Sequence, residues 1–288
     1  MAIEQWEQQH VAVGRDRAGR WLVEQRLGQQ PQRQPQLQPL RGRVHSVESM
    51  GTLDGPGIRY VLFLQGCPLR CAFCHNRDTW SLWGGQEKDV EEVWNDLIRY
   101  RPYMKASGGG VTVSGGEPTL QAAFVAELFR RCREAGVHTA LDTSGYARVE
   151  RPEVREVLAY TDLVLLDIKA MDPQLHRWLT GGDPARIRRF ASFLADQRIP
   201  AWIRVVLIPG ITDTEENLTV LASYVRTLPN VEKVELLPYT KLGEHKWAKQ
   251  GDRSPLSEVR EAGQSDVASA AAILTAGGIG HLLGQPVG

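Results

Sequence analysis

No excess of either charge distinguishes this 288-residue chain, in which 34 lysines and arginines balance 34 aspartates and glutamates. Without a basic surplus, the composition gives no indication of nucleic-acid binding. Long hydrophobic runs are missing too: the nearest candidate, residues 268–283, is interrupted by Ser269, Thr275, His281 and several glycines, so we do not expect it to span a bilayer. No signal-peptide pattern opens the chain. We expect a cytoplasmic protein that binds neither membranes nor nucleic acid.

Cysteine is scarce as well, with four residues in the whole chain. Three of them, Cys67, Cys71 and Cys74, are crowded together, a distribution that argues against a framework of disulfide staples. The fourth, Cys132, stands in an amphipathic segment that stops at Gly136 and is typical of a half-buried helix position. We therefore expect a reducing compartment.

The crowded cysteines form a C-x3-C-x2-C motif directly after an apolar segment, residues 60–65. Three close thiols indicate a metal site. A [4Fe–4S] cluster normally takes four cysteinates, one per iron, so three would leave one iron open to a small molecule. The alternative is structural zinc held by three thiolates and His75. Because the adjacent residues Cys74 and His75 would both have to reach one ion, the spacing favours iron–sulfur.

The first forty residues differ in composition from everything after them. Glutamine dominates, and Pro31, Pro35 and Pro39 prevent a helix or a central strand from propagating. We interpret residues 1–40 as a flexible, disordered N-terminal extension. An arm that docks on a partner is the functional alternative, but a biased polar composition alone supports only the solvated interpretation. The globular domain is expected to start near Arg41.

From there, near-continuous apolar runs alternate with helix-like stretches. The strand candidates are residues 60–65, 110–113, 137–142, 162–167, 201–207 and 231–237. The helix candidates are residues 90–100, 120–135, 152–159, 184–195 and 215–227. Parallel strands separated by helices indicate βαβ units with right-handed crossovers. Six such units predict an α/β fold, a partial parallel (β/α)6 barrel over residues 41–250 rather than a closed eight-fold barrel.

Distinctive residues follow the ends of these strands. The cysteines follow the first strand, Gly115-Gly116 the second, Asp142-Thr143 the third, and residues 167–169 the fourth, while Arg204 lies within the fifth. In parallel barrels the carboxyl ends of the strands carry the active site. Each feature also has a structural interpretation, since two glycines can form a tight turn and charges at strand ends often form ion pairs. Their convergence with the cysteines favours an active site.

Several motifs together resemble a known family. The C-x3-C-x2-C motif with Phe73 inside it, followed downstream by Gly-Gly-Glu117, is similar to the radical S-adenosylmethionine (SAM) superfamily. More narrowly, the chain resembles the pyruvate formate-lyase activating family within the glycyl-radical-enzyme activases. The segments that carry this narrower resemblance are residues 42–49, 51–59, 74–80, 106–112 and 236–239. The resemblance extends from about Arg41 to Lys249.

The resemblance implies a radical SAM chemistry. Cys67, Cys71 and Cys74 would hold a [4Fe–4S] cluster that binds SAM at its open iron and passes it one electron. SAM would then release methionine and a 5′-deoxyadenosyl radical, which abstracts a hydrogen from a glycine of pyruvate formate-lyase. Flavodoxin or ferredoxin would be the low-potential electron donor, and we expect the protein to be a monomer.

The family's site residues map onto this sequence position by position. Residues matching SAM contacts are Phe73, His75, Gly116, Asp167, Ile168, Lys169 and Thr240. Asp142, Thr143 and Asp167 resemble a monovalent-cation site near the SAM carboxylate, and two carboxylates there would otherwise repel each other. Asp54 matches a position near the glycine loop of the partner enzyme.

The sequence also departs from the family pattern. Thr240 stands where related chains have a histidine, and a threonine cannot stack or reach as an imidazole does. Residues 251–288 diverge, with residues 265–275 as one candidate helix packed on the barrel. Activation of a different glycyl radical enzyme is an alternative, although the chain lacks the extra ferredoxin-like cysteines common in such activases. An alternative function outside the enzymes is a non-catalytic, zinc-binding scaffold protein.

Overall fold

The computed structural model describes residues 13–15, 21–23 and 40–284. The chain divides into two compact units, Met1–Gln38 and Pro39–Gly288. In the first unit, strand β1 (Val13–Arg15) pairs antiparallel with strand β2 (Trp21–Val23). The predicted disordered extension lies otherwise outside the described residues and stays a prediction.

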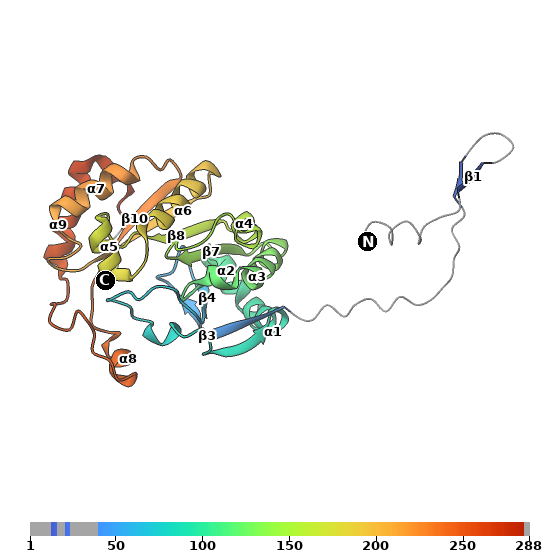
Figure 1. Ribbon diagram of the computed structural model, residues 1–288, viewed down its shortest axis with the longest axis horizontal. Coiled ribbons are helices and arrows are strands. Elements are labelled where there is room, and N and C mark those ends of the chain that lie inside the picture. The colour runs from blue at the N-terminus through green and yellow to red at the C-terminus, as the bar shows by residue number, and fades with distance from the viewer. Residues whose placement is uncertain (1–12, 16–20, 24–39, 285–288) are drawn as a thin grey trace, which may run out of the picture. The chain divides into compact units, whose positions relative to one another are not determined.

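The second unit is built on an eight-stranded sheet with the order β10-β9-β8-β7-β6-β4-β3-β5 (Figure 1). Neighbouring strands from β4 to β10 are parallel. These six strands are β4 (Arg59–Leu64), β6 (Gly110–Gly115), β7 (His138–Thr143), β8 (Leu163–Asp167), β9 (Ala201–Leu207) and β10 (Val231–Pro238). They match the six strand candidates, and the sheet stays open between β10 and β5. The predicted α/β partial barrel is confirmed.

Two further strands were not anticipated from the sequence. Strand β3 (Arg41–Gly51) pairs antiparallel with β4, and β5 (Gln86–Asp89) pairs antiparallel with β3. Most side chains of β3 and all four of β5 remain at least partly exposed. Because β3 and the edge strand β5 bury little apolar surface, they lack the continuous apolar runs that identify the central strands.

Helices connect the parallel strands. They are α1 (Val90–Leu97), α2 (Arg101–Ser107), α3 (Ala122–Glu134), α4 (Pro152–Ala159), α5 (Pro173–Thr180), α6 (Pro184–Asp196), α7 (Glu215–Val225), α8 (Glu244–Lys249) and α9 (Gln264–Leu274). Short 3-10 segments cover Arg77–Thr79, Ile98–Tyr100, Pro118–Gln121 and Gly280–Leu282, and a π-helical turn covers Thr275–Ile279. Helix α1 starts with a reciprocal capping box between Asp89 and Glu92, which satisfies two otherwise unpaired backbone donors. Helices α2, α5 and α8 were missed.

One apolar core joins the sheet to the helices around it. Phe124 and Phe129 of α3 and Phe190 of α6 are almost completely buried in it, and each such side chain contributes about 1.5–3 kcal/mol by leaving water. Cys132 also lies in this core with no exposed surface, so the expected half-buried position was wrong. Helix α9 packs against α7 and β10.

The helices of residues 40–284 include none that is both long and apolar enough to cross a membrane.

Candidate active site

A cavity of about 330 Å³ opens at the carboxyl ends of the parallel strands. All six strands β4 to β10 or the loops after them contribute to its wall. Among the sequence-predicted site residues, those that line it are Asp54, Cys67, Cys71, Phe73, Cys74, His75, Gly116, Asp142, Thr143, Asp167 and Lys169. The structure therefore brings together side chains that are more than a hundred positions apart in the sequence.

Gly116 fixes the cysteine loop against the end of β6. Its amide donates to the carbonyl of Leu64, and the Glu117 amide donates to the carbonyl of Gly66. A Cβ atom at Gly116 would lie 2.1 Å from the Gly66 carbonyl oxygen and 3.2 Å from the Cys67 Cβ. Gly115 has a φ of +119°, which L side chains rarely adopt. The glycine pair is therefore required by the close approach of two backbones beside the cysteines.

The three cysteines are half-buried and line the cavity. Burial raises the pKa of both Cys67 and Cys71 to about 12. The Lys169 ammonium works in the opposite direction on both thiols. Because a thiolate is the metal-binding form, metal uptake at this site must release protons.

Lys169 and Asp167 form an ion pair inside the cavity. Lys169 Nζ lies 2.6 Å from Asp167 Oδ2 and 5.2 Å from the centre of the Phe73 ring. Burial acts to lower the pKa of Lys169, but Asp167 and Cys71 more than offset it, and the pKa is raised. Lys169 is consequently a permanent positive charge beside the cysteines.

Asp142 and Arg204 form a second charged group in the cavity. Arg204 Nη1 lies 3.3 Å from Asp142 and 3.6 Å from Asp54. Ser114 also donates to Asp142, at 2.6 Å. Burial raises the pKa of Asp142 to about 6, although Arg204 opposes the rise. Asp54 is likewise held in place, because its carbonyl accepts from the Thr112 hydroxyl at 2.6 Å.

Glu117 is an important residue to which the sequence reasoning assigned no role. Its carboxylate is fully buried and accepts from the hydroxyls of Thr119, Thr143 and Ser144 at 2.6–2.8 Å. It thereby ties the end of β6 to the end of β7. The sequence did contain a sign of this role, because Glu117 is a charged residue inside the Gly-Gly-Glu-Pro motif next to a helix. Two of its partners, Thr143 and Ser144, become its neighbours only in the folded protein.

Each of the three residues predicted to bind a monovalent cation contacts other side chains of this protein. Asp142 contacts Arg204 and Ser114, Asp167 contacts Lys169, and the Thr143 hydroxyl donates to Glu117. The role of these three residues in binding a cation stays a prediction.

Comparison with known proteins places this chain in a family. The model of the radical SAM superfamily matches residues 61–221. The pyruvate formate-lyase 1-activating enzyme of Escherichia coli K12 is 49% identical over 219 residues, which cover 76% of this chain and 89% of the relative. The pyruvate formate-lyase-activating enzyme of Listeria monocytogenes is 49% identical over 237 residues, 81% of this chain and 96% of the relative.

Two solved structures have folds similar to that of this chain. A domain of a pyruvate-formate lyase-activating enzyme from Bacteroides vulgatus superimposes with a TM-score of 0.52 at 30% identity, over 63% of this chain and all of that one. Streptococcus suis SuiB bound to S-adenosylmethionine has a TM-score of 0.57 at 18% identity, over 77% of this chain and 48% of that one, and shows the shared fold. The chain belongs to the pyruvate formate-lyase activating family of radical SAM enzymes.

Members of this family use a [4Fe–4S] cluster and SAM, and the residues present fit such a cluster. The three thiols share one cavity next to the Lys169 cation. His75 Nε2 lies 3.1 Å from the carbonyl oxygen of Thr240. Within residues 40–284, no three His, Cys, Asp or Glu side chains are close enough together to hold a single ion. A cluster, in which each thiolate binds a separate iron, suits this arrangement better than zinc, whose ligands must all lie about 2.0–2.3 Å from one ion.

Two of the residues that match SAM contacts of the family, Ile168 and Thr240, do not line the cavity. Ile168 is buried, and its amide donates to the Arg204 carbonyl. The Thr240 carbonyl faces His75, while its hydroxyl is buried without a hydrogen-bond partner among the described residues. A role of the Thr240 side chain therefore stays a prediction, and its unpaired hydroxyl is available for one.

Proposed function

We propose that this protein cleaves SAM reductively and uses the resulting radical to remove a hydrogen atom from a glycine of pyruvate formate-lyase. The observation that carries the proposal is the convergence of three thiols, the Gly115-Gly116 turn and the Asp167–Lys169 pair on one cavity. The relatives at 49% identity are named as activating enzymes of pyruvate formate-lyase, which supports the choice of partner.

Cys67, Cys71 and Cys74 hold the cluster in this proposal. When bound, the cluster supplies the single electron that breaks the bond between the SAM sulfur and its 5′ carbon. Methionine leaves, and the 5′-deoxyadenosyl radical takes a hydrogen atom from the glycine, giving 5′-deoxyadenosine and a glycyl radical. Lys169 offsets the negative charge of the thiolates, which favours their ionised form.

The wall beyond the thiols binds and orients SAM. A cavity of about 330 Å³ falls within the range of small-molecule sites. The Gly116 backbone would meet the amine of SAM, Phe73 and His75 would border its adenine, and residues 167–169 at the end of β8 would also contact SAM. Asp142, Thr143 and Asp167 would hold a monovalent cation near the SAM carboxylate.

The partner glycine approaches past Asp54, which lies at the cavity with its backbone fixed by Thr112. A low-potential flavodoxin or ferredoxin supplies the electron, and the protein acts as a monomer. The protein acts in the cytoplasm, where free thiols such as these stay reduced.

Anaerobic reconstitution with iron and sulfide, followed by reduction and addition of SAM, tests the proposal. With pyruvate formate-lyase present we expect 5′-deoxyadenosine and a glycyl radical signal in electron paramagnetic resonance (EPR) spectra. Absence of both would overturn the proposed function. A glycyl radical formed only on another glycyl radical enzyme would keep the chemistry and replace the partner.

Two cysteine variants make this test specific. Cys71→Ala should lose the cluster, measured as iron and sulfide per protein, and with it all SAM cleavage. Cys132→Ala is the matched control, because Cys132 is buried in the apolar core away from the cavity. Loss of the cluster in the control would contradict the assignment of ligands.

A further inference from the structure

One arginine is completely buried and, among the described residues, is bonded to no carboxylate. Arg59 is the first residue of β4 and has no exposed surface. Its guanidinium hydrogen-bonds to neutral groups, namely the carbonyls of Pro56 and Val111, the hydroxyl of Thr112 and the ring of His138. The activity proposed above gives Arg59 no role. Because burying a cation without an opposite charge is costly, its presence needs a reason beyond packing.

The Arg59 guanidinium connects β6 to the loop of residues 51–58, which brings Asp54 to the cavity. Its Nη1 donates to the Pro56 carbonyl at 3.0 Å, and its Nε donates to the Thr112 hydroxyl on β6. That hydroxyl in turn donates to the Asp54 carbonyl at 2.6 Å. Arg59 therefore holds the loop at two points, directly at Pro56 and through Thr112 at Asp54.

The same loop also packs against the carboxyl end of α2 and the residues after it. The Ile58 amide donates to the Ser107 hydroxyl at 2.8 Å. Gly57 has a φ of +65°, and a Cβ atom there would lie 2.4 Å from the Gly109 nitrogen and 2.6 Å from the Ser107 carbonyl oxygen. Only a glycine allows two backbones to approach so closely in this conformation. The loop is therefore fixed by backbone contacts near α2 as well as by Arg59.

The carboxylate of Asp54 is held less tightly than its backbone. Arg204 Nη1 lies 3.6 Å from it, whereas a charge-assisted hydrogen bond measures about 2.7–2.9 Å. The backbone anchors therefore decide where this carboxylate lies on the cavity wall. Its oxygens keep the capacity to accept a hydrogen bond from a backbone N–H group of an incoming chain.

Neither Arg59 nor Thr112 lines the cavity, so their influence on the site passes through the loop. We propose that both are positioning residues, which hold Asp54 in the place where the glycine segment of pyruvate formate-lyase binds. This inference rests on the proposed function, because it requires that partner. A loop that is ordered before the partner arrives loses less conformational freedom on binding. Loosening the loop should therefore weaken binding of the partner and leave SAM cleavage unchanged.

Thr112→Val removes the connecting hydroxyl and keeps the size of the side chain. We expect the KM for pyruvate formate-lyase to rise about tenfold. The kcat for glycyl radical formation should stay within about twofold of wild type, the pattern of lost binding rather than lost chemistry. SAM cleavage without the partner should keep its wild-type rate, and Thr112→Ser, which retains a hydroxyl, should restore the KM. The growth of the glycyl radical EPR signal at several partner concentrations gives both constants.

Thr139→Val is the matched control. Thr139 lies on the neighbouring strand β7, is equally buried, and donates its hydroxyl to the Tyr160 carbonyl at 2.6 Å rather than to the loop of residues 51–58. This variant loses a buried hydroxyl of the same kind, and we expect it to keep the wild-type KM. Arg59→Lys retains the charge without the fork of donors and should raise the KM at least as much as Thr112→Val does.

A second measurement needs neither cluster nor partner. In the metal-free protein, hydrogen–deuterium exchange followed by mass spectrometry reports how often the loop opens. Thr112→Val should raise deuterium uptake by a peptide spanning residues 51–59 at least severalfold, because the Asp54 carbonyl loses its donor. Uptake by the same peptide in Thr139→Val should match wild type.

The outcomes separate the two proposals. If the wild-type protein places no radical on pyruvate formate-lyase, the proposed function fails. If it does so and Thr112→Val keeps the wild-type KM, the positioning role is overturned while the function stands. An equal rise of the KM in Thr112→Val and Thr139→Val would reveal general destabilisation and also overturn the role. Unchanged deuterium uptake over residues 51–59 in Thr112→Val would show that the hydroxyl does not hold the loop.

Discussion

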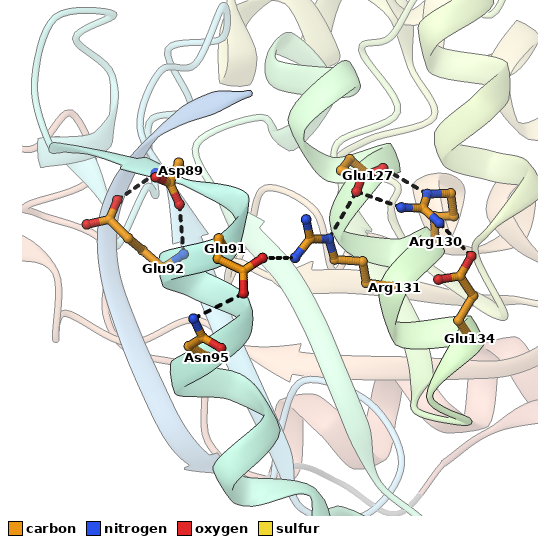
Figure 2. A network of polar contacts seen from close by, with 8 residues as sticks. All are labelled: Asp89, Glu91, Glu92, Asn95, Glu127, Arg130, Arg131 and Glu134. Atoms are coloured by element: carbon orange, nitrogen blue, oxygen red, sulfur yellow. Dashed lines mark hydrogen bonds and ion pairs between the residues drawn. The ribbon is translucent and has the colours of Figure 1, made fainter. Parts of the chain in front are cut away.

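Two groups of ion pairs in this protein can be compared: one in the cavity at the strand ends, and one on the surface between α1 and α3, which Figure 2 shows. On the surface, Glu127 accepts from both Arg130 and Arg131, and Arg131 also reaches Glu91 on α1. In the cavity, Asp142 faces Arg204 and Asp167 faces Lys169. The partners are of the same chemical kind, and the surroundings differ.

The surroundings reverse the effect on the carboxyl groups. The hydrogen bond from Arg130 is the largest influence on Glu127 and holds its pKa at about 2. Burial is the largest influence on Asp142 and raises its pKa to about 6 despite Arg204. An ion pair therefore has a small desolvation penalty where water remains and a large one where water is excluded. Retaining ionisable groups at such a cost is typical of a functional site.

The largest difference between the two regions should appear when one cation is removed from each. Lys169→Met leaves Asp167 without its partner in the cavity, so we expect a loss of about 3 kcal/mol in the free energy of unfolding and at least 100-fold slower SAM cleavage. Arg130→Met on the surface should cost less than about 1 kcal/mol. Urea unfolding and release of 5′-deoxyadenosine measure the two effects. Equal destabilisation by both variants would remove the distinction.

The pH dependence of stability should differ in sign. Because burial raises the folded pKa of Asp142 from the ordinary value of 3.8 to about 6, the folded state binds more protons than the unfolded state between these values. The contribution of Asp142 to stability should therefore fall as pH rises from about 4 to 6, by on the order of 2 kcal/mol. Asp142→Asn should remove this slope in urea unfolding of the metal-free protein. A variant that keeps the wild-type slope would contradict the assignment.

The smallest effect belongs to Glu127. Its folded pKa is lowered from 4.5 to about 2, so its contribution is present above pH 4.5 and is lost as pH falls through 2. The side chain is partly exposed, and solvent screening limits the effect to about 1 kcal/mol at most. Glu127→Gln should therefore flatten the stability curve only in strong acid, and added salt should shrink the difference from wild type. A salt-independent loss of several kcal/mol would place this network with the buried one.

Sequence patterns predicted the central elements of the fold well and its margins poorly. Most of the six parallel strands are apolar runs that follow from burial on both faces, and α4 begins at Pro152 and ends at Ala159 as expected. Strands β3 and β5 and helices α2, α5 and α8 were missed. Helix α8 has six residues and one buried side chain, Trp247, which is too short for a periodic pattern. It is fixed by tertiary contacts with the cysteine loop.

The sequence by itself determined the family, the presence of six parallel strands and the identity of the thiols, because cysteine spacing and apolar runs are local properties of the chain. Only the tertiary structure decided what surrounds them. Glu117 found its three hydroxyl partners, Asp142 acquired its raised pKa, and Trp247 reached Cys74. Each of these depends on burial and on contacts between distant segments, and both arise only when the strand ends come together.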